Sequence, residues 1–185
     1  MGVLRRAFVV IVATLGLLLP AELRVEAQGV STPGLTAAFL FNFVKFTTWP
    51  DDALRTSGAI VVCVSGDDRI ADALVQLTEN KMVEGHPIAV RRTNLDRPLT
   101  ECHVVYGGSL DGNSAQALIR AAASHPILTV SDLEDFAQRG GMANFFIDAG
   151  KMRFSVNPDA ADRARLKISS RLLSLARVVR DRGGP

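Results

Sequence analysis

The chain has little of what several protein classes require. Its 185 residues carry a formal net charge of only +2, which excludes a strongly basic nucleic-acid binder, so nucleic acid is not an expected partner. Glycine and proline, at 15 and 8 residues, are too ordinary for a fibrous or low-complexity protein. With 48% hydrophobic residues the chain can bury a core, and its length favours a single domain.

The short motifs of common enzyme classes are also missing. No GxGxxG, P-loop, GxSxG or HExxH pattern occurs, and His86, His103 and His125 share no helical face. The cysteines have neither CxxC spacing nor histidines at zinc-ligand spacing. The sequence therefore predicts no catalytic residue, no metal and no cofactor. A hydrolase with an unrecognised site stays an alternative.

The first residues have the composition of a secretory signal peptide. Arg5 and Arg6 precede an apolar run over residues 7–19, and small residues stand before a cleavage point after Ala27. We expect a signal peptide over 1–27 and a single exported domain over 28–185. An uncleaved membrane anchor is the alternative, but the run is shorter than the roughly 20 residues that cross a bilayer.

Both cysteines, Cys63 and Cys102, lie in the exported part. An even cysteine count in an oxidising compartment favours one disulfide between them, with two buried free thiols as the alternative. His103 beside Cys102 could suggest a Cys/His nucleophile pair. Neighbouring residues of a strand point to opposite faces, however, so a disulfide with His103 turned away is the simpler interpretation.

Apolar periodicity predicts the fold class. Continuous apolar runs indicate strands at residues 59–65, 88–92, 102–106 and 127–130. Helical periods indicate intervening helices at residues 34–49, 67–80 and 114–123. This alternation predicts an α/β domain of three layers, with flanking helices over a mixed, mostly parallel sheet.

Later elements follow from capping and turn signals. Ser131-Asp132-Leu133-Glu134 is a capping box that opens a short helix ending at Gly140-Gly141. Strands at 142–147 and 152–156 are joined by Asp148-Ala149-Gly150, which predicts a C-terminal antiparallel hairpin. After the N-cap Asn157-Pro158, we expect a last helix from about Asp162 to Arg180. Its buried stripe would be Ile168, Leu172, Leu175 and Val179.

Small and polar residues follow three of the predicted strands. They include Gly66, Asp67, Gly107, Ser109 and Ser131. Ligands of open α/β sheets bind at the carboxyl ends of strands, so these loops could form a small-ligand cleft. Tight strand-to-helix turns require the same residue types, which is the alternative explanation.

Charge is unevenly distributed. Residues 163–185 carry seven basic side chains against Asp181 alone, a net charge of +6, whereas residues 28–162 carry −5. Arg163, Lys167 and Arg171 would line one face of the predicted last helix. We expect them to meet a partner, either an acidic protein surface or anionic head groups, although a solvated face is the alternative.

The first predicted helix has a second candidate surface. Phe39, Phe43 and Phe46 form its apolar stripe, and Phe41 and Lys45 lie on the opposite side. If the stripe faces the core, Phe41 is partly exposed, and exposed aromatic side chains are enriched at protein interfaces. The alternative is a helix between two layers, which would bury both of its faces.

Several segments together resemble the YfiR family across nearly all of the exported chain. They are Ala38 to Phe43 with Lys45-Phe46 and Trp49-Pro50, Cys63-Val64 with Gly66-Asp67, Cys102-His103-Val104, Leu128 to Asp132, Gly140-Gly141-Met142, Phe154 with Asn157, and Leu166 to Leu173. Each segment is weak alone, but their order and spacing are specific.

The resemblance implies a small periplasmic regulator without catalytic activity. Such a protein binds the periplasmic domain of an inner-membrane diguanylate cyclase and holds it inactive, and an outer-membrane lipoprotein sequesters the repressor. Such regulation would set the level of cyclic di-GMP and hence biofilm formation. A second copy of the chain, forming a homodimer, is a further candidate partner. Family members can carry a second cysteine pair where this chain has Ala137 and Asn144, so redox control through two disulfides is in doubt here.

The principal rival function is a periplasmic small-molecule sensor or solute-binding protein that uses the strand-end loops.

Overall fold

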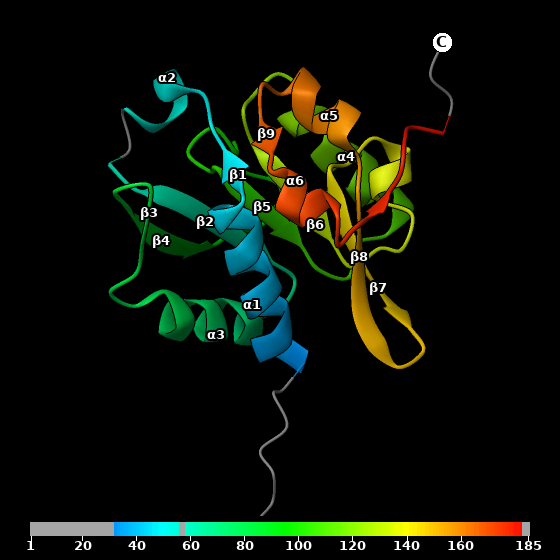
Figure 1. The fold of residues 1–185 in the computed structure, drawn as a ribbon, viewed down its shortest axis with the longest axis horizontal. Helices are drawn as coiled ribbons and strands as arrows, with labels where there is room; N and C mark the ends of the chain where they lie inside the picture. The colour runs from blue at the N-terminus through cyan, green and yellow to red at the C-terminus, as the bar shows by residue number, and fades with distance from the viewer. Residues whose placement is uncertain (1–31, 56–57, 183–185) are drawn as a thin grey trace, which may run out of the picture.

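A mixed sheet lies between two layers of helices (Figure 1). This computed structural model describes residues 32–55 and 58–182, so the predicted signal peptide lies outside the described residues. Helices α1 (Thr32–Lys45) and α3 (Asp68–Thr78) cover one face of the sheet, and α4 (Gly112–Ala122) covers the other. The arrangement confirms the predicted three-layer α/β domain.

The sheet has the strand order β10-β8-β7-β6-β5-β2-β4-β3. Its strands are β2 (Ile60–Ser65), β3 (Met82–Val83), β4 (His86–Arg92), β5 (Val104–Gly107), β6 (Leu128–Ser131), β7 (Ala143–Asp148), β8 (Lys151–Val156) and β10 (Arg177–Val178). The pairs β7–β8 and β3–β4 are antiparallel, and the other neighbours are parallel. A separate antiparallel pair joins β1 (Thr47–Thr48) to β9 (Lys167–Ile168).

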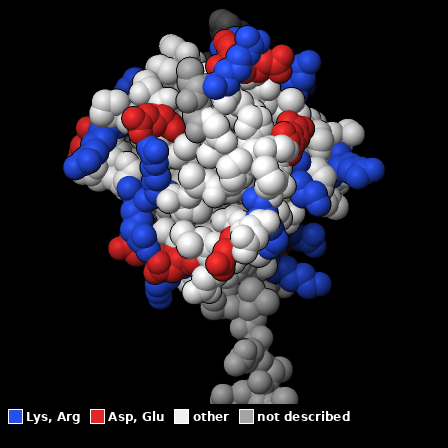
Figure 2. Space-filling model, turned by 90° about the vertical axis from the view of Figure 1, so that its left-hand side faces the viewer, with Lys and Arg blue, Asp and Glu red and all other residues white. Residues whose placement is uncertain are grey.

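Short helical elements complete the described chain. They are α2 (Asp51–Leu54), the 3₁₀ helix η1 (Ala137–Arg139), α5 (Pro158–Arg163) and α6 (Ser170–Leu173). Strands β3 and β4 form the end of the sheet at the left of Figure 1, and this end faces the viewer in Figure 2.

The central strand β2 separates two apolar cores. Its even-numbered residues, Ile60, Val62 and Val64, belong to the core under α1 and α3. Val61 and Cys63 belong to the core under α4. Because successive side chains of a strand alternate between faces, a strand covered on both sides must be apolar throughout. This explains the continuous apolar run that predicted the strand.

Helix α1 packs on the hairpin through an aromatic cluster. The rings of Phe39 and Phe43 lie 5.3–5.8 Å from those of Phe145 and Phe154. The predicted stripe therefore faces the core. The helix ends at Lys45 rather than at residue 49, because Thr47 and Thr48 leave it to pair with β9.

The predicted hairpin is confirmed. Phe145 pairs with Phe154 and Asp148 with Lys151, and the turn residues Ala149 and Gly150 have φ values of 47° and 73°. Positive φ at both central positions is the geometry of the two-residue turns that match the right-handed twist of paired strands.

The short helix after the capping box is only a three-residue 3₁₀ helix, η1. Ser131 Oγ accepts a hydrogen bond from the amide of Leu133, so it caps a turn rather than a helix. Gly140 ends η1 with a φ of 105°, as predicted for its C-terminus.

The predicted helix from Asp162 to Arg180 is wrong. Asn157 does cap a helix that has Pro158 in its first turn, but α5 ends at Arg163 and Arg165 has a φ of 58°. Residues 167–168 then pair with β1, Ser169 caps α6, and residues 177–178 add a strand beside β8.

Because the chain does not form this helix, the four residues of the predicted apolar stripe do not lie on one helix face. Leu172 is buried, whereas the Leu175 side chain is 72% exposed. Pairing with distant strands thus outweighs the local helical periodicity.

Candidate functional site

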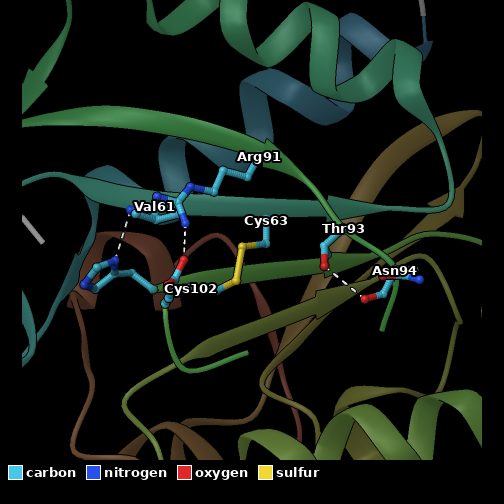
Figure 3. Close-up of a disulfide and its surroundings, with 8 residues drawn as sticks. Val61, Cys63, Arg91, Thr93, Asn94 and Cys102 are labelled. Carbon is cyan, nitrogen blue, oxygen red and sulfur yellow. Dashed lines mark hydrogen bonds and ion pairs between the residues drawn. A yellow bond between two sulfur atoms is a disulfide. The ribbon is translucent and has the colours of Figure 1, made fainter. Parts of the chain in front are cut away.

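Cys63 and Cys102 form a disulfide between β2 and the segment that leads into β5 (Figure 3). Their Cα atoms are 5.9 Å apart, and both side chains are buried in the core under α4. The predicted pairing is confirmed, and the alternative of two free thiols is wrong. A buried disulfide fits an oxidising compartment.

The disulfide holds a long connection against the sheet. The two cysteines are 39 positions apart in the sequence, and the loop that they close includes the segment between β4 and β5. Arg91 of β4 forms an ion pair with Glu101 beside it, and the Cys102 amide donates to the Leu99 carbonyl. The connection is therefore fixed by a covalent bond, an ion pair and a backbone hydrogen bond within a few residues.

His103 points to the other face of the sheet from Cys102, as the alternation rule predicts. Its Nδ1 accepts from the Val61 amide at 3.0 Å, and its Nε2 lies 3.1 Å from the Ala53 carbonyl, so the ring donates there. The ring of Trp49 packs edge-on against it, and Trp49 Nε1 donates to the His103 carbonyl. Both ring nitrogens thus hold α2 and β2 together, and burial lowers the pKa of His103 below its ordinary value.

The loops after β2, β5 and β6 meet at one edge of the sheet, as predicted. The Ser131 hydroxyl, which is fully buried, donates to the Gly107 carbonyl at 2.8 Å. The Ser109 amide donates to the Asp132 carboxylate at 2.7 Å. The loops therefore bind each other through the groups that a ligand would use.

Asp67 and Gly66 also contact other groups of the protein. Asp67 caps α3 by accepting from the Arg69 amide, and the Arg69 guanidinium beside it lowers the pKa of the carboxyl. A Cβ placed on Gly66 would lie 2.3 Å from the Gly108 carbonyl oxygen, so the two loops are in direct contact. A ligand cleft at these loops stays a prediction, and these contacts favour the turn interpretation.

Phe41 and Lys45 line a hollow of about 350 Å³ on the side of α1 that faces β3. Phe41 is half-buried, as expected for the side opposite the core stripe. Lys81 lies over its ring, 5.3 Å from the ring centre, and Met82 lines the same hollow. Lys81 and Met82 were not predicted as site residues, because a two-residue strand is too short to show a period.

Arg163, Lys167 and Arg171 are all exposed but do not share a helix face. Arg163 ends α5, Lys167 lies in β9, and Arg171 lies in α6. The predicted i, i+4, i+8 line of cations is therefore wrong, because the chain is extended between the two helices.

Several cations of the C-terminal segment bind acids of the same molecule. Arg165 pairs with Asp52 at 3.1 Å, Arg180 pairs with Asp159, and Arg182 lies 4.0 Å from Asp135. Arg163 pairs with Asp181 at 2.8 Å. The basic C-terminal segment, which begins at residue 163, is thus held by ion pairs against acidic residues that precede it in the sequence. Within the described chain, Lys167 and Arg171 have no ion pair.

A family model described as YfiR/HmsC-like matches residues 34–177. The chain belongs to the YfiR/HmsC-like family. The match confirms the resemblance and includes both cysteines and every candidate partner-binding residue.

The fold is also similar to a crystal structure of a conserved domain protein from Vibrio cholerae O1 biovar El Tor strain N16961. The TM-score is 0.50 at 13% identity, and the alignment covers 80% of this chain and 60% of that one. The chain therefore spans less than two thirds of that protein, and the likeness concerns the fold alone.

Asn144 is one of the two positions where the sequence resemblance implies a second cysteine pair in other family members. Its Oδ1 accepts from the amide of Ala137, the other such position, at 3.3 Å. Its Nδ2 donates to the Glu134 carbonyl. In this chain a buried amide therefore links the two segments by hydrogen bonds.

Over residues 32–55 and 58–182, no three His, Cys, Asp or Glu side chains are grouped so that they could hold a metal ion. The same residues contain no helix with the length and apolar character needed to span a membrane.

Replacing both Cys63 and Cys102 by alanine should lower the free energy of unfolding by about 2–4 kcal/mol, because the closed loop restricts the unfolded chain. Chemical denaturation of the variant and the oxidised wild type measures the difference. Labelling of thiols in the denatured, unreduced wild type would contradict the disulfide.

Gly66→Ala should destabilise the fold by about 2 kcal/mol or more, because the new Cβ would strike a backbone oxygen at a φ of 93°. Gly85→Ala is the matched control, since Gly85 has a φ of 82° with open space around it. It should cost only about 1 kcal/mol. Equal losses in thermal unfolding would argue against contact between the Gly66 and Gly108 loops.

His103 should make the protein less stable in mild acid. Its folded pKa lies below the unfolded value near 6.5, so the unfolded chain binds the proton more readily. The contribution of His103 to stability is complete above about pH 7 and declines as the pH falls through 6.5 toward the folded pKa. His103→Asn should show a flatter dependence of unfolding free energy on pH between 8 and 5.5. An unchanged slope would assign the acid sensitivity to other groups.

Proposed function

We propose that this protein is a periplasmic regulator that represses an inner-membrane diguanylate cyclase by binding its periplasmic domain. Repression of the cyclase lowers the level of cyclic di-GMP and reduces biofilm formation. An outer-membrane lipoprotein relieves the repression by sequestering the regulator. The observation that carries the proposal is membership of the YfiR/HmsC-like family over residues 34–177.

The arrangement of reactive groups is consistent with a binding role rather than catalysis. The two cysteines are joined, and His103 uses both ring nitrogens in structural hydrogen bonds. Asp67 and Asp111 cap helices, and Ser131 bonds a neighbouring strand. Each of these groups has a role in holding the fold together.

The partner surface in this proposal lies around the C-terminal end of α1. Lys167 lies in β9, which pairs with β1 directly after that helix, and the Ser169 amide donates to the Phe46 carbonyl. Arg171 follows in α6, and Figure 1 shows α6 beside α1. Lys45 ends α1 itself. These exposed cations suit an acidic surface on the cyclase.

Lys167→Glu with Arg171→Glu should weaken association with the periplasmic domain of the cyclase about tenfold or more at low salt. The loss should be mainly in the association rate and should shrink at high salt. Thermal stability should stay close to that of the wild type, because both side chains are exposed and lack ion pairs among the described residues. Surface plasmon resonance at two ionic strengths measures the effect.

Lys151→Glu with Arg153→Glu is the matched control. It makes the same change of charge on exposed residues of the β7–β8 hairpin, which lie outside the surface of Lys45, Lys167 and Arg171. Equal losses in both double variants would show that net charge, and not this surface, governs binding.

The proposed role itself is tested in cells. Deleting the gene should raise cyclic di-GMP, and the tagged protein should co-purify with the membrane-bound cyclase. Unchanged cyclic di-GMP in the deletion strain, together with no cyclase in the purified complex, would overturn the proposal.

A further inference from the structure

The β7–β8 hairpin extends beyond the sheet to which it belongs. Within the described chain, β6 pairs only with residues 143–144 of β7, and β10 pairs only with residues 155–156 of β8. Residues 145–148 and 151–154 therefore pair only with each other. Figure 1 shows the resulting two-stranded ribbon projecting from the body of the molecule, with its turn at the far end.

One face of this ribbon is apolar almost to its end. Phe145 and Phe154 pair across the two strands and pack against Phe39 of α1, and Phe145 is only 4% exposed. Alternation places the next pair of this face, Ile147 with Met152, further along the ribbon. Because Ile147 is 67% exposed, the apolar row of the core continues there as an exposed apolar surface.

The other face of the ribbon is cationic. Phe146 pairs with Arg153, and the Arg177 guanidinium lies 4.1 Å from the centre of the Phe146 ring. Lys151 is two positions from Arg153 and so lies on the same face. All three cations are exposed, and none of them forms an ion pair with another described residue. They differ in this from the paired arginines of the C-terminal segment.

The ribbon has a single acidic residue, Asp148. It lies directly opposite Lys151, so it offsets one positive charge. Three cations and one acid leave the end of the hairpin with an excess of positive charge beside its apolar surface. Exposed apolar side chains bordered by free cations are typical of segments that lie in the interface of an anionic membrane.

We propose that the end of the β7–β8 hairpin binds the surface of an anionic phospholipid bilayer. In this arrangement Ile147 and Met152 lie at the boundary between head groups and acyl chains, and the three cations contact the lipid phosphates. Long basic side chains can extend from an inserted segment to the head groups. The contact requires neither the cyclase nor the surface proposed for it, so this inference is independent of the proposed repression.

Two features favour a bilayer over an acidic protein. The ribbon is two strands wide and projects from the molecule, so its end offers little area to a folded partner, whereas stable protein interfaces bury about 800 Å² on each side. A bilayer needs no matching shape, and each basic side chain near an anionic lipid surface contributes about 1 kcal/mol.

Co-sedimentation with lipid vesicles tests the proposal. At low salt the purified mature protein should bind vesicles of equal parts phosphatidylglycerol and phosphatidylcholine at least about tenfold more tightly than vesicles of phosphatidylcholine alone. The preference should shrink at high salt, because ions screen the attraction between exposed cations and phosphates. Equal binding to both kinds of vesicle, or no binding to the anionic ones, would overturn the proposal and leave the hairpin for a protein partner.

Ile147→Ser should weaken binding to the anionic vesicles about fivefold or more, because it removes an apolar side chain from the membrane boundary. Leu175→Ser is the matched control, since Leu175 is 72% exposed and lies in the turn after α6, outside the hairpin. It should bind as the wild type does. Equal losses in the two variants would contradict the assignment to the hairpin.

Lys151→Glu with Arg153→Glu should weaken binding to the anionic vesicles at least about tenfold. Arg97→Glu with Arg120→Glu makes the same change of net charge on exposed residues outside the hairpin and should have a much smaller effect. Similar losses in both double variants would overturn the proposal, and thermal unfolding checks that each is folded. Association with the periplasmic domain of the cyclase is measured without lipid, so the hairpin variant stays a charge control there.

Tryptophan fluorescence locates the contact. Trp49, the one native tryptophan, is buried, so Ile147→Trp adds a reporter on the hairpin and Leu175→Trp adds one outside it. With anionic vesicles, the emission added by Ile147→Trp should shift to shorter wavelength and should be quenched by brominated lipid. The emission added by Leu175→Trp should not respond. Quenching in Leu175→Trp without quenching in Ile147→Trp would place the membrane contact elsewhere and reject the proposal.

Discussion

Burial of β2 on both faces is the constraint on which the rest of the structure depends. Its side chains alternate between the core under α1 and α3 and the core under α4. The strand can keep its hydrogen bonds only with strands on both sides, and β4 and β5 supply them. The disulfide from Cys63 and the hydrogen bond from the Val61 amide to His103 then attach the connection before β5 to this strand from opposite faces.

The same arrangement explains why residues that suggest chemistry have structural roles. Cysteine beside histidine is a pattern of nucleophilic enzymes, but in a strand the two side chains go to different layers. The small residues after β2, β5 and β6 resemble ligand loops. In the structure they let the loops approach each other closely enough for Ser131 to reach Gly107 and for Gly66 to lie against Gly108.

Charge separation along the sequence also has a structural consequence. The basic C-terminal segment lies on the acidic body through Arg165–Asp52 and Arg180–Asp159, and the Arg177 guanidinium lies over the Phe146 ring. Exposed ion pairs of this kind contribute little individually. Together they orient the segment that places Lys167 and Arg171 beside α1, where the proposed partner surface lies.

The sequence by itself determined the α/β class, the main strands, the hairpin and the cysteine pairing, because each depends on local periodicity, turn chemistry or cysteine count. Tertiary structure decided the path of residues 162–180. Residues 162–180 have a helical apolar period, yet Lys167–Ile168 and Arg177–Val178 are strands because β1 and β8 offer backbone partners that no local pattern reveals. The edge of β4 is likewise left open over residues 88–92, because β3 pairs only with His86 and Pro87. Such surfaces are formed by segments distant in sequence, and only folding brings those segments together.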